Sequence, residues 1–464
     1  MKSINRRNFI KKTSLSAASI YLATNASCSG LDERPSSGGS YMGDFAAPKL
    51  ETVKIAIIGV GARGSGHARQ LASIEGTEIV AISDLYEDLV DRAVQRCKEA
   101  GKGRHQSIAR YFGEEDAWKV MLRERKPDMV IVATNWKNHA PMAIEAMEQG
   151  AHAFVEVPIA VTVEEMWNLV DTSERTQRHC MMMENVNYGR DELLYLNLCR
   201  KGIIGELLHA EAAYIHELRI QMEEQDRGTG SWRTHHYAER NGNLYPTHGL
   251  GPVAQYMNIG RGEDMFKTLV SFSSPARGRA LYAEKNYPEN HKWNELTYKG
   301  GDLNTSLIKT HLGRTVMVQW DETSPRPYTR HNLIQGTSGT LAGFPTRVAL
   351  EEGVPGATDS HHSWAQGDAL ASLYEEFEHP LFKRVGALAE KMGGHGGMDF
   401  LMLFRIVECL REGLPLDQNV YEGCLWSAVG PLSEASVAQE GMPQAFPDFT
   451  RNQWNTTLPL DIIA

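Results

Sequence analysis

The stretch VKIAIIGVGARG, residues 53–64, decides the fold of this chain. It begins with an apolar run that predicts a buried strand, and a helical stretch follows the last glycine. Between them lie Gly59, Gly61 and Gly64 in G-x-G-x-x-G spacing. In that context the first glycine makes a tight turn, the second lets the backbone approach a phosphate, and the helix N-terminus favours an anion. The stretch therefore predicts a dinucleotide-binding turn.

The next predicted strand, TEIVAISD, ends in Asp84. A carboxylate at this place can hold ribose hydroxyls and would repel a 2′-phosphate, so NAD is predicted as the cofactor rather than NADP. Arg63 is the one nearby cation that would favour the phosphate. A glycine turn without any dinucleotide is the alternative, and the strand–turn–helix context argues against it.

Short apolar strands alternate with helical stretches over the first half of the chain, which predicts a parallel, doubly wound sheet. The strands are expected at 53–59, 77–84, 128–134, 152–157 and 180–186. After residue 205 the strands become longer and partly alternating, at 206–217, 265–274, 304–313 and 314–322. They predict a mainly antiparallel sheet in an α+β second domain, followed by a helix over 398–413 and a tail. We expect a Rossmann domain over 51–186 and a substrate-binding domain over 187–464.

Composition excludes some classes of function. The chain has 464 residues, 42% of them hydrophobic, and a net charge of −10. No basic footprint for nucleic acid is present. The six cysteines are scattered without CxxC or zinc spacing, so neither a disulfide framework nor a metal site is predicted.

The N-terminus reads as an export signal over residues 1–30, followed by a Ser/Gly/Pro-rich linker over 31–50. Arg6-Arg7 followed by Asn8-Phe9 resembles the twin-arginine type, which exports folded proteins. We expect a periplasmic or cell-envelope location and the twin-arginine machinery as a partner. Cys28 is a candidate lipid-anchor site, and a cysteine with no such role is an equal alternative.

Polar clusters follow the third, fourth and fifth predicted strands: 135–139, Glu156-Val157-Pro158 and Glu184-Asn185. Ligands of such sheets bind beyond the carboxyl ends of the strands. Glu156 is therefore expected to face the cofactor rather than a core, with helix capping as the competing explanation.

The glycine turn, the E-x-P sequence at the fourth strand and the second sheet together resemble the Gfo/Idh/MocA oxidoreductases. In that family the motif is Glu-Lys-Pro and its lysine assists proton transfer; here the position is Val157. The closer resemblance is to glycoside hydrolase family 109, whose members resemble NAD-dependent α-N-acetylgalactosaminidases. It rests on GVGARG, NWKNHAPMA, EVP, MMMENVNYGR, GSWRTHH, NLYPTHGLGP and GGHGGMDF, and it covers nearly the whole chain.

The resemblance implies two sets of contact residues. For the cofactor they are Ala62, Arg63, Asp84, Trp136, Lys137, Asn138, His139, Glu156, Val157 and Asn185. For the sugar they are Tyr214, Arg233, Tyr245, Pro246, Thr247, His248 and Tyr328. Ordinary sheet packing for Tyr214 and a surface ion pair for Arg233 are the plain alternatives.

The implied reaction is redox-neutral hydrolysis of a glycoside or glycan terminus. The sugar is oxidised at C3, the C2 proton and the C1 substituent are eliminated, water adds at C1, and C3 is reduced again. We predict His248 as the base near the C3 hydroxyl, in place of the missing lysine. Tyr245 and Tyr328 are predicted to act on the C2 proton or the leaving group, with the roles undivided. A loop histidine bonded to backbone is the plain alternative for His248.

Two other functions stay open at this point. One is an NAD-dependent sugar dehydrogenase that releases oxidised product, against which Val157 counts. The other is a noncatalytic sugar-binding protein of the cell envelope, against which the glycine turn and YPTHG count. His395 is expected either to line the cleft or merely to precede a helix. An exposed face of the second sheet would allow a homodimer.

Overall fold

The computed structural model describes residues 34–35, 38–357, 360 and 362–461. The described residues between 38 and 461 form one compact unit. The predicted signal, residues 1–30 with Cys28, lies outside the described residues. Within the described part, no helix is both long and apolar enough to span a bilayer.

The first sheet of the described chain is parallel and has six strands. They are β1 (Val53–Ile58), β2 (Thr77–Ser83), β3 (Ala109–Tyr111), β4 (Met129–Val132), β5 (His152–Val155) and β6 (Cys180–Met182). Their order, β3-β2-β1-β4-β5-β6, is that of a Rossmann fold, with the reversal of strand order between β1 and β4. The connecting helices are α2 (Gly64–Ser73), α3 (Glu87–Ala100), α4 (Ala117–Arg125), α5 (Trp136–Glu148) and α6 (Val163–Thr176). The doubly wound sheet is confirmed, and β3 is a strand that the sequence did not predict.

The second sheet has nine strands among the described residues, and only the β7–β10 pair is parallel. The strands are β7 (Leu207–Ile215), β8 (Phe266–Ser273), β9 (Asn304–Thr310), β10 (Thr315–Asp321), β11 (Leu333–Gly336), β12 (Gly339–Ala342), β13 (Arg347–Leu350), β14 (Ala365–Gln366) and β15 (Gln444–Ala445). Buried and exposed positions alternate along β9, as expected for a sheet with one face on a core. The mainly antiparallel second sheet is therefore also confirmed.

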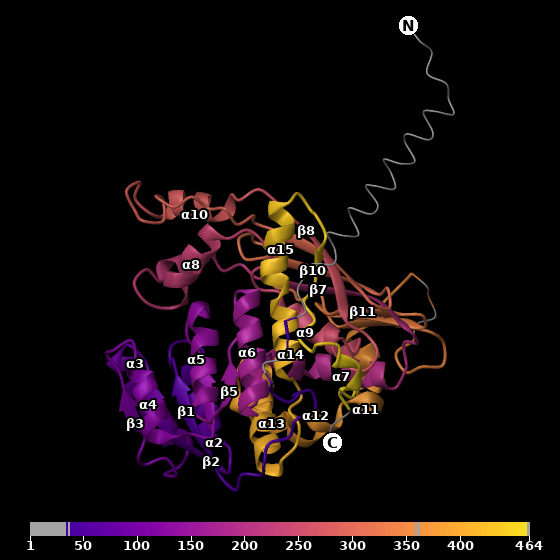
Figure 1. The fold of residues 1–464 in the computed structure, drawn as a ribbon. Coiled ribbons are helices and arrows are strands. Elements are labelled where there is room, and N and C mark those ends of the chain that lie inside the picture. The colour runs from indigo at the N-terminus through magenta and orange to yellow at the C-terminus, as the bar shows by residue number, and fades with distance from the viewer. Residues whose placement is uncertain (1–33, 36–37, 358–359, 361, 462–464) are drawn as a thin grey trace. The chain divides into compact units, whose positions relative to one another are not determined.

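Helices pack against both sheets (Figure 1). After the first sheet come η1 (Asn185–Tyr188), α7 (Arg190–Arg200), η2 (Arg219–Glu223), α8 (Thr229–Glu239), α9 (Thr247–Tyr256) and α10 (Gly278–Asn286). The C-terminal part adds η3 (Gly367–Leu370), α11 (Ala371–Phe377), α12 (Pro380–Met392), η4 (His395–Gly397), α13 (Met398–Glu412), α14 (Val420–Ser427), α15 (Val429–Ala438) and η5 (Trp454–Thr456).

The C-terminal helix α13 lies beside α2, which belongs to the first sheet (Figure 1). Its apolar residues Leu403 and Leu410 share one hydrophobic core with Ile55 of β1. Part of the sequence expected in the second domain therefore closes one face of the Rossmann sheet. This packing brings the start of α13 to the glycine turn.

Within the predicted linker over 31–50, the described residues from Tyr41 onward pack against the C-terminal part of the chain. The Tyr41 ring stacks on Tyr421 with a centroid separation of 4.8 Å, and its hydroxyl bonds to Thr457. Met42 is only 4% exposed. Burial of the apolar side chains at these positions removes apolar surface from water and stabilises the packed segment, although glycine and serine precede it.

Candidate functional site

The three glycines of the turn after β1 have different physical roles. Gly59 has φ +84°, and a Cβ there would lie 2.5 Å from the carbonyl oxygen of Ala133. A Cβ at Gly64 would lie 1.9 Å from the carbonyl oxygen of Gly59. At Gly61 no described atom lies within 4 Å of such a Cβ. Two glycines therefore allow close packing, while Gly61 leaves open space where a pyrophosphate can approach the N-terminus of α2.

Asp84 ties the end of β2 to this turn. Its Oδ2 atom accepts a hydrogen bond from the Val60 amide at 2.8 Å, and its Oδ1 atom accepts one from the Tyr86 amide at 3.1 Å. Both oxygens keep capacity to accept from ribose hydroxyls. The carboxylate is thus fixed by the backbone in the position that the sequence predicted.

A cavity of about 960 Å³ extends from the glycine turn to the second sheet. Most of the predicted site residues line it: Gly59, Gly61, Ala62, Arg63, Asp84, Trp136, Asn138, His139, Glu156, Val157, Asn185, Tyr214, Arg233, Tyr245 and His248. His395 lines it as well. The volume lies at the upper end of the range for ligand pockets, so both a dinucleotide and a sugar can be accommodated.

Glu156 lies at the end of β5, where its carboxylate is held by two residues of the glycine turn and α2. Its Oε1 atom lies 2.6 Å from Nε2 of His67 and 3.0 Å from Nε of Arg63. Burial alone would raise the pKa of Glu156, but the Arg63 charge and the His67 hydrogen bond outweigh it and hold the pKa well below its usual range. Glu156 therefore lines the cavity with an ionised carboxylate.

Asp399, at the start of α13, completes this ionic cluster from the far end of the chain. Nη1 and Nη2 of Arg63 donate to its two carboxylate oxygens at 2.9 and 3.1 Å. The Asn185 amide donates to Oδ1 at 2.6 Å, and Nδ1 of His395 lies 2.9 Å from Oδ2. Sequence reasoning missed Asp399 and His67. The four-residue spacing of Arg63 and His67, which places both on one helix face, was the available signal for His67.

His248 is the second residue of α9, lines the cavity and is supported by a buried carboxylate. Its Nδ1 atom lies 2.6 Å from Oε1 of Glu184, which is 0% exposed. Because a carboxylate only accepts, Nδ1 carries the proton, and Nε2 of the neutral ring is an acceptor. The Tyr245 hydroxyl lies 3.3 Å from Nε2 and donates to it. Glu184 was not among the predicted site residues, although its neighbour Asn185 was.

Arg233 on α8 brings a permanent positive charge to the same cavity. Its guanidinium lies 4.8 Å from the ring centroid of Trp136 and 5.4 Å from that of Tyr245. Burial by itself lowers the pKa of Arg233, but nearby Tyr237 and Glu322 raise it above the usual value. Its Nε atom is buried and has no hydrogen-bond partner among the described residues. The geometry fits a cation that donates to an oxygen of a bound ligand.

Comparison with known proteins agrees with this site. Residues 188–456 match the family described as "Glycosyl hydrolase 109, C-terminal domain", and residues 53–184 match "Oxidoreductase family, NAD-binding Rossmann fold". A relative from Akkermansia muciniphila, "Glycosyl hydrolase family 109 protein 1", is 62% identical over 92% of this chain and 88% of its own length. The chain belongs to glycosyl hydrolase family 109.

A second family 109 relative, from Shewanella pealeana, is 54% identical over 99% of both chains. Among solved structures, a levoglucosan dehydrogenase in complex with NADH and L-sorbose has a TM-score of 0.63 and 18% identity, over 86% of this chain and 100% of its own. An NAD binding oxidoreductase from Klebsiella pneumoniae gives the same TM-score, with 16% identity over 86% of this chain and 99% of its own. These structures share the fold. The cofactor of this family 109 protein is NAD, as predicted.

Five predicted residues do not line the cavity of the family 109 protein. Gly64 packs on Gly59, and Lys137 points to solvent from the first turn of α5. Pro246 and Thr247 are buried beneath His248 at the start of α9. Tyr328 is 39% exposed, and its ring lies 5.0 Å from His216 and 6.2 Å from Tyr214, both of which line the cavity. Tyr328 therefore lies at the edge of the site.

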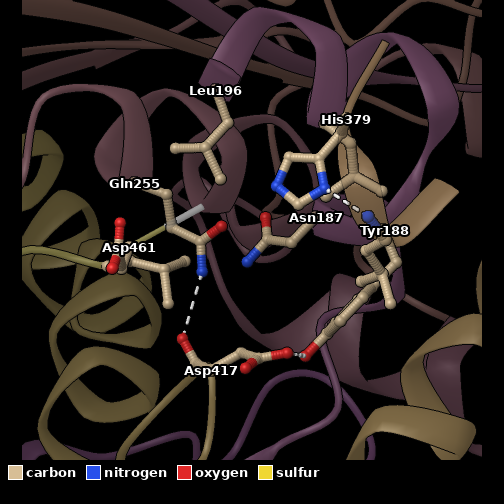
Figure 2. A pocket seen from close by; sticks show the side chains of 10 residues that line it. Asn187, Tyr188, Leu196, Gln255, His379, Asp417 and Asp461 are labelled. Atoms are coloured by element: carbon tan, nitrogen blue, oxygen red, sulfur yellow. Dashed lines mark hydrogen bonds between the residues drawn. The ribbon is translucent and has the colours of Figure 1, made fainter. Parts of the chain in front are cut away.

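A second, much smaller cavity lies between η1, α9 and α12, away from the glycine turn (Figure 2). Its volume is about 20 Å³, room for about one water molecule and far too little for a sugar. Asn187 points into it, and neither polar atom of that side chain has a hydrogen-bond partner among the described residues (Figure 2). The large cavity is therefore the candidate active site.

Proposed function

We propose that this family 109 protein is an α-N-acetylgalactosaminidase that works by redox-neutral elimination and hydration. The observation that carries the proposal is that His248, held by the buried Glu184, lines the cofactor cavity, while Val157 occupies the position of the usual lysine. A dehydrogenase needs a proton acceptor beside the alcohol that it oxidises, and Val157 cannot supply one. Nε2 of His248 can.

The cofactor contacts fit NAD, with Gly61 and α2 at the pyrophosphate and Asp84 at a ribose. Bound NAD supplies a reversible two-electron oxidant for C3 of the sugar. His248 takes the proton of the C3 hydroxyl as that carbon becomes a ketone, and returns it when C3 is reduced at the end. Glu184 holds the proton on Nδ1 throughout, so Nε2 remains the exchanging nitrogen.

The ketone acidifies the proton at C2, so the C2–H and C1–O bonds can break together and leave an enone. Burial and the neighbouring Tyr214 raise the pKa of Tyr245 well above its usual value, so Tyr245 stays protonated and suits proton donation to the leaving oxygen. Tyr328, whose hydroxyl oxygen accepts from Arg330 at 2.9 Å at the edge of the site, is the other tyrosine that we propose for the C2 proton or the leaving group. Water then adds its hydroxyl to C1 and a proton to C2, and hydrolysis is complete without net oxidation.

The test uses purified protein with no added NAD and an aryl α-N-acetylgalactosaminide in D2O. We expect aryl release together with deuterium at C2 of the freed sugar, read by NMR. Aryl release without deuterium at C2 would contradict the elimination. No release, with NADH formed from added NAD+ and free sugars, would assign the protein as an NAD-dependent sugar dehydrogenase instead.

We further propose twin-arginine export to the periplasm or cell envelope, with Cys28 as a candidate lipid anchor. The support is the Arg6-Arg7 signal and a reaction that returns the cofactor unchanged. Replacement of both arginines by lysine should leave the protein in the cytoplasmic fraction, and labelling with a palmitate analogue tests Cys28. A homodimer through the second sheet is supported by Phe272 and Leu307, which are 62% and 46% exposed. Light scattering in solution tests it.

A further inference from the structure

One wall of the large cavity is a segment of the second domain that reaches over the Rossmann domain. We call residues 218–231, which include η2 and the start of α8, the arm. Cavity-lining residues of the arm are Leu218, Gln221, Asp226, Arg227, Gly228, Thr229 and Ser231. On the Rossmann side the same cavity is lined by Asp84, Leu85, Tyr86 and Leu89, the segment that follows β2. The arm and the ribose-binding Asp84 thus border the same space.

The base of the arm is fixed by a small hydrophobic cluster of its own. Met222 is 1% exposed and packs with Ala283 and Trp293. The Trp293 indole donates to the Met222 carbonyl at 2.8 Å, and the Lys292 ammonium donates to the Gln225 carbonyl at 2.6 Å. Met222 precedes α8 in the sequence and Ala283 belongs to α10; both helices are labelled in Figure 1. The arm is therefore held on the second-domain side independently of the Rossmann domain.

The tip of the arm contacts the Rossmann domain through Arg227. Its Nη1 atom lies 3.0 and 3.2 Å from the two carboxylate oxygens of Asp88, in the first turn of α3. Its guanidinium also lies 5.3 Å from the ring centroid of Tyr86. The Tyr86 amide donates to Asp84, so the residues that receive Arg227 directly follow the cofactor-binding carboxylate. The tip thus closes the cavity wall where the adenosine half of NAD is expected.

We propose that the arm is a strap that retains NAD, with Arg227 as its latch onto Asp88 and Tyr86. NAD leaves at an appreciable rate only after this latch opens. The strap would hold the NAD assigned above, and the reason for such retention rests on the proposed redox-neutral reaction. A cofactor that ends each turnover unchanged need not leave, and an exported enzyme has no supply from which to replace it.

The expected size of the effect follows from the exposure of the latch. The side chains of Arg227 and Asp88 are 53% and 57% exposed, so the ion pair and the ring contact are weak interactions. Loss of both should accelerate NAD release roughly tenfold. The fold should be unaffected, because no buried group loses its partner.

The test measures exchange on the holoenzyme without any sugar. Protein carrying NAD is mixed with an excess of deuterated NAD, desalted at intervals and analysed by mass spectrometry for the bound isotope. The matched control is Arg110→Ala, because Arg110 also pairs with a carboxylate of α3, Asp91, at 50% and 49% exposure, but lies outside the cavity lining. We expect roughly tenfold faster exchange in Arg227→Ala, a smaller gain in Asp88→Asn, which keeps the contact with the Tyr86 ring, and no change in Arg110→Ala.

Equal exchange rates in Arg227→Ala and the wild type would overturn the proposal. So would the same acceleration in Arg110→Ala, since that would be a general charge effect. Thermal unfolding of the NAD-free proteins confirms that the variants fold. Since exchange is read without substrate, failure of the strap and failure of the glycosidase proposal are separate results.

Discussion

Nδ1 of His248 lies 2.6 Å from Oε1 of Glu184, and no part of the Glu184 side chain is exposed to solvent. The same oxygen accepts from the Val186 amide at 3.4 Å at the start of η1. The carboxylate is therefore positioned by the backbone, and it selects one imidazole tautomer. This relationship resembles the carboxylate–histidine pair of a catalytic triad, in which the acid orients the ring rather than exchanging the proton.

Replacing Glu184 by Gln should reduce kcat by about 10²–10⁴ with little change in KM. The amide fills the same space but can also donate, so the proton is no longer held on Nδ1. Nitrogen-15 NMR of the histidine ring should show loss of the Nδ1–H form. Glu114→Gln is the control, because Glu114 is an exposed carboxylate of the same cavity. An unchanged kcat in Glu184→Gln would contradict the proposal that His248 is the base and that Glu184 positions it.

Arg63 is expected to be the most important single residue for the stability of the cofactor site. Arg63→Ala would leave the carboxylates of Glu156 and Asp399 without their guanidinium partner, and removal of one member of such a pair costs about 3–5 kcal/mol. Arg63→Lys should lose less stability than Arg63→Ala, because the ammonium keeps the positive charge. It should still lose some, because an ammonium cannot bind two groups in the forked geometry. Urea unfolding of NAD-free protein measures the loss. Arg110→Ala, at an exposed pair, should lose little stability, and an equal loss in both variants would contradict the prediction.

Features that depend on a short stretch of sequence, such as buried strands and the glycine turn, could be predicted from the sequence. The apolar runs of β1, β4 and β5 are buried on both faces, and this made them recognisable. β3 was missed because its three residues, Ala109–Tyr111, form a partly exposed edge strand with no apolar run. Asp84 could be located from its distance to the glycine turn, which is set by one β-α-β unit.

The rest of the site depends on contacts between distant segments. Arg63 and Asp399 are 336 positions apart, and nothing near either residue in the sequence indicates the other. Glu184 and His248 come from different domains of the prediction, and a buried carboxylate beside a strand end has no distinctive spacing. Such pairs arise from how α13 packs on α2 and β1 and how α9 packs on η1, which is a property of the tertiary structure.

Two buried histidines should make the fold sensitive to mild acid. Burial lowers the pKa of His152 to about 4 and that of His179 to about 3, against about 6.5 in an unfolded chain. Because the pKa of each histidine is lower in the folded protein than in the unfolded chain, each neutral ring contributes fully to stability above pH 6.5. That contribution is lost as the pH falls toward 4 for His152 and toward 3 for His179. At 1.36 kcal/mol per pKa unit, each histidine accounts for about 3–5 kcal/mol over that window.

His152→Gln should flatten the dependence of the unfolding free energy on pH between about 6.5 and 4. The glutamine oxygen can accept from the His179 amide, as Nδ1 of His152 does at 2.9 Å, but it cannot be protonated. Chemical unfolding at a series of pH values gives the slope. His311→Gln is the matched control at an exposed histidine and should leave the slope unchanged. A slope that His152→Gln does not alter would mean that His152 is not neutral in the fold.

Asp84 should set the preference for NAD over its 2′-phosphorylated form. Asp84→Asn keeps an oxygen that accepts from the Val60 amide, so the turn should retain its shape, but it removes the charge that repels a phosphate. We expect NADH to bind more weakly and the ratio of NADPH to NADH dissociation constants to fall roughly 10- to 100-fold. Titration of NAD-free protein, followed by cofactor fluorescence, measures both constants. Glu114→Asn removes a charge elsewhere in the cavity and serves as the control. If Asp84→Asn weakens both cofactors equally, the carboxylate stabilises the turn through Val60 and does not discriminate between them.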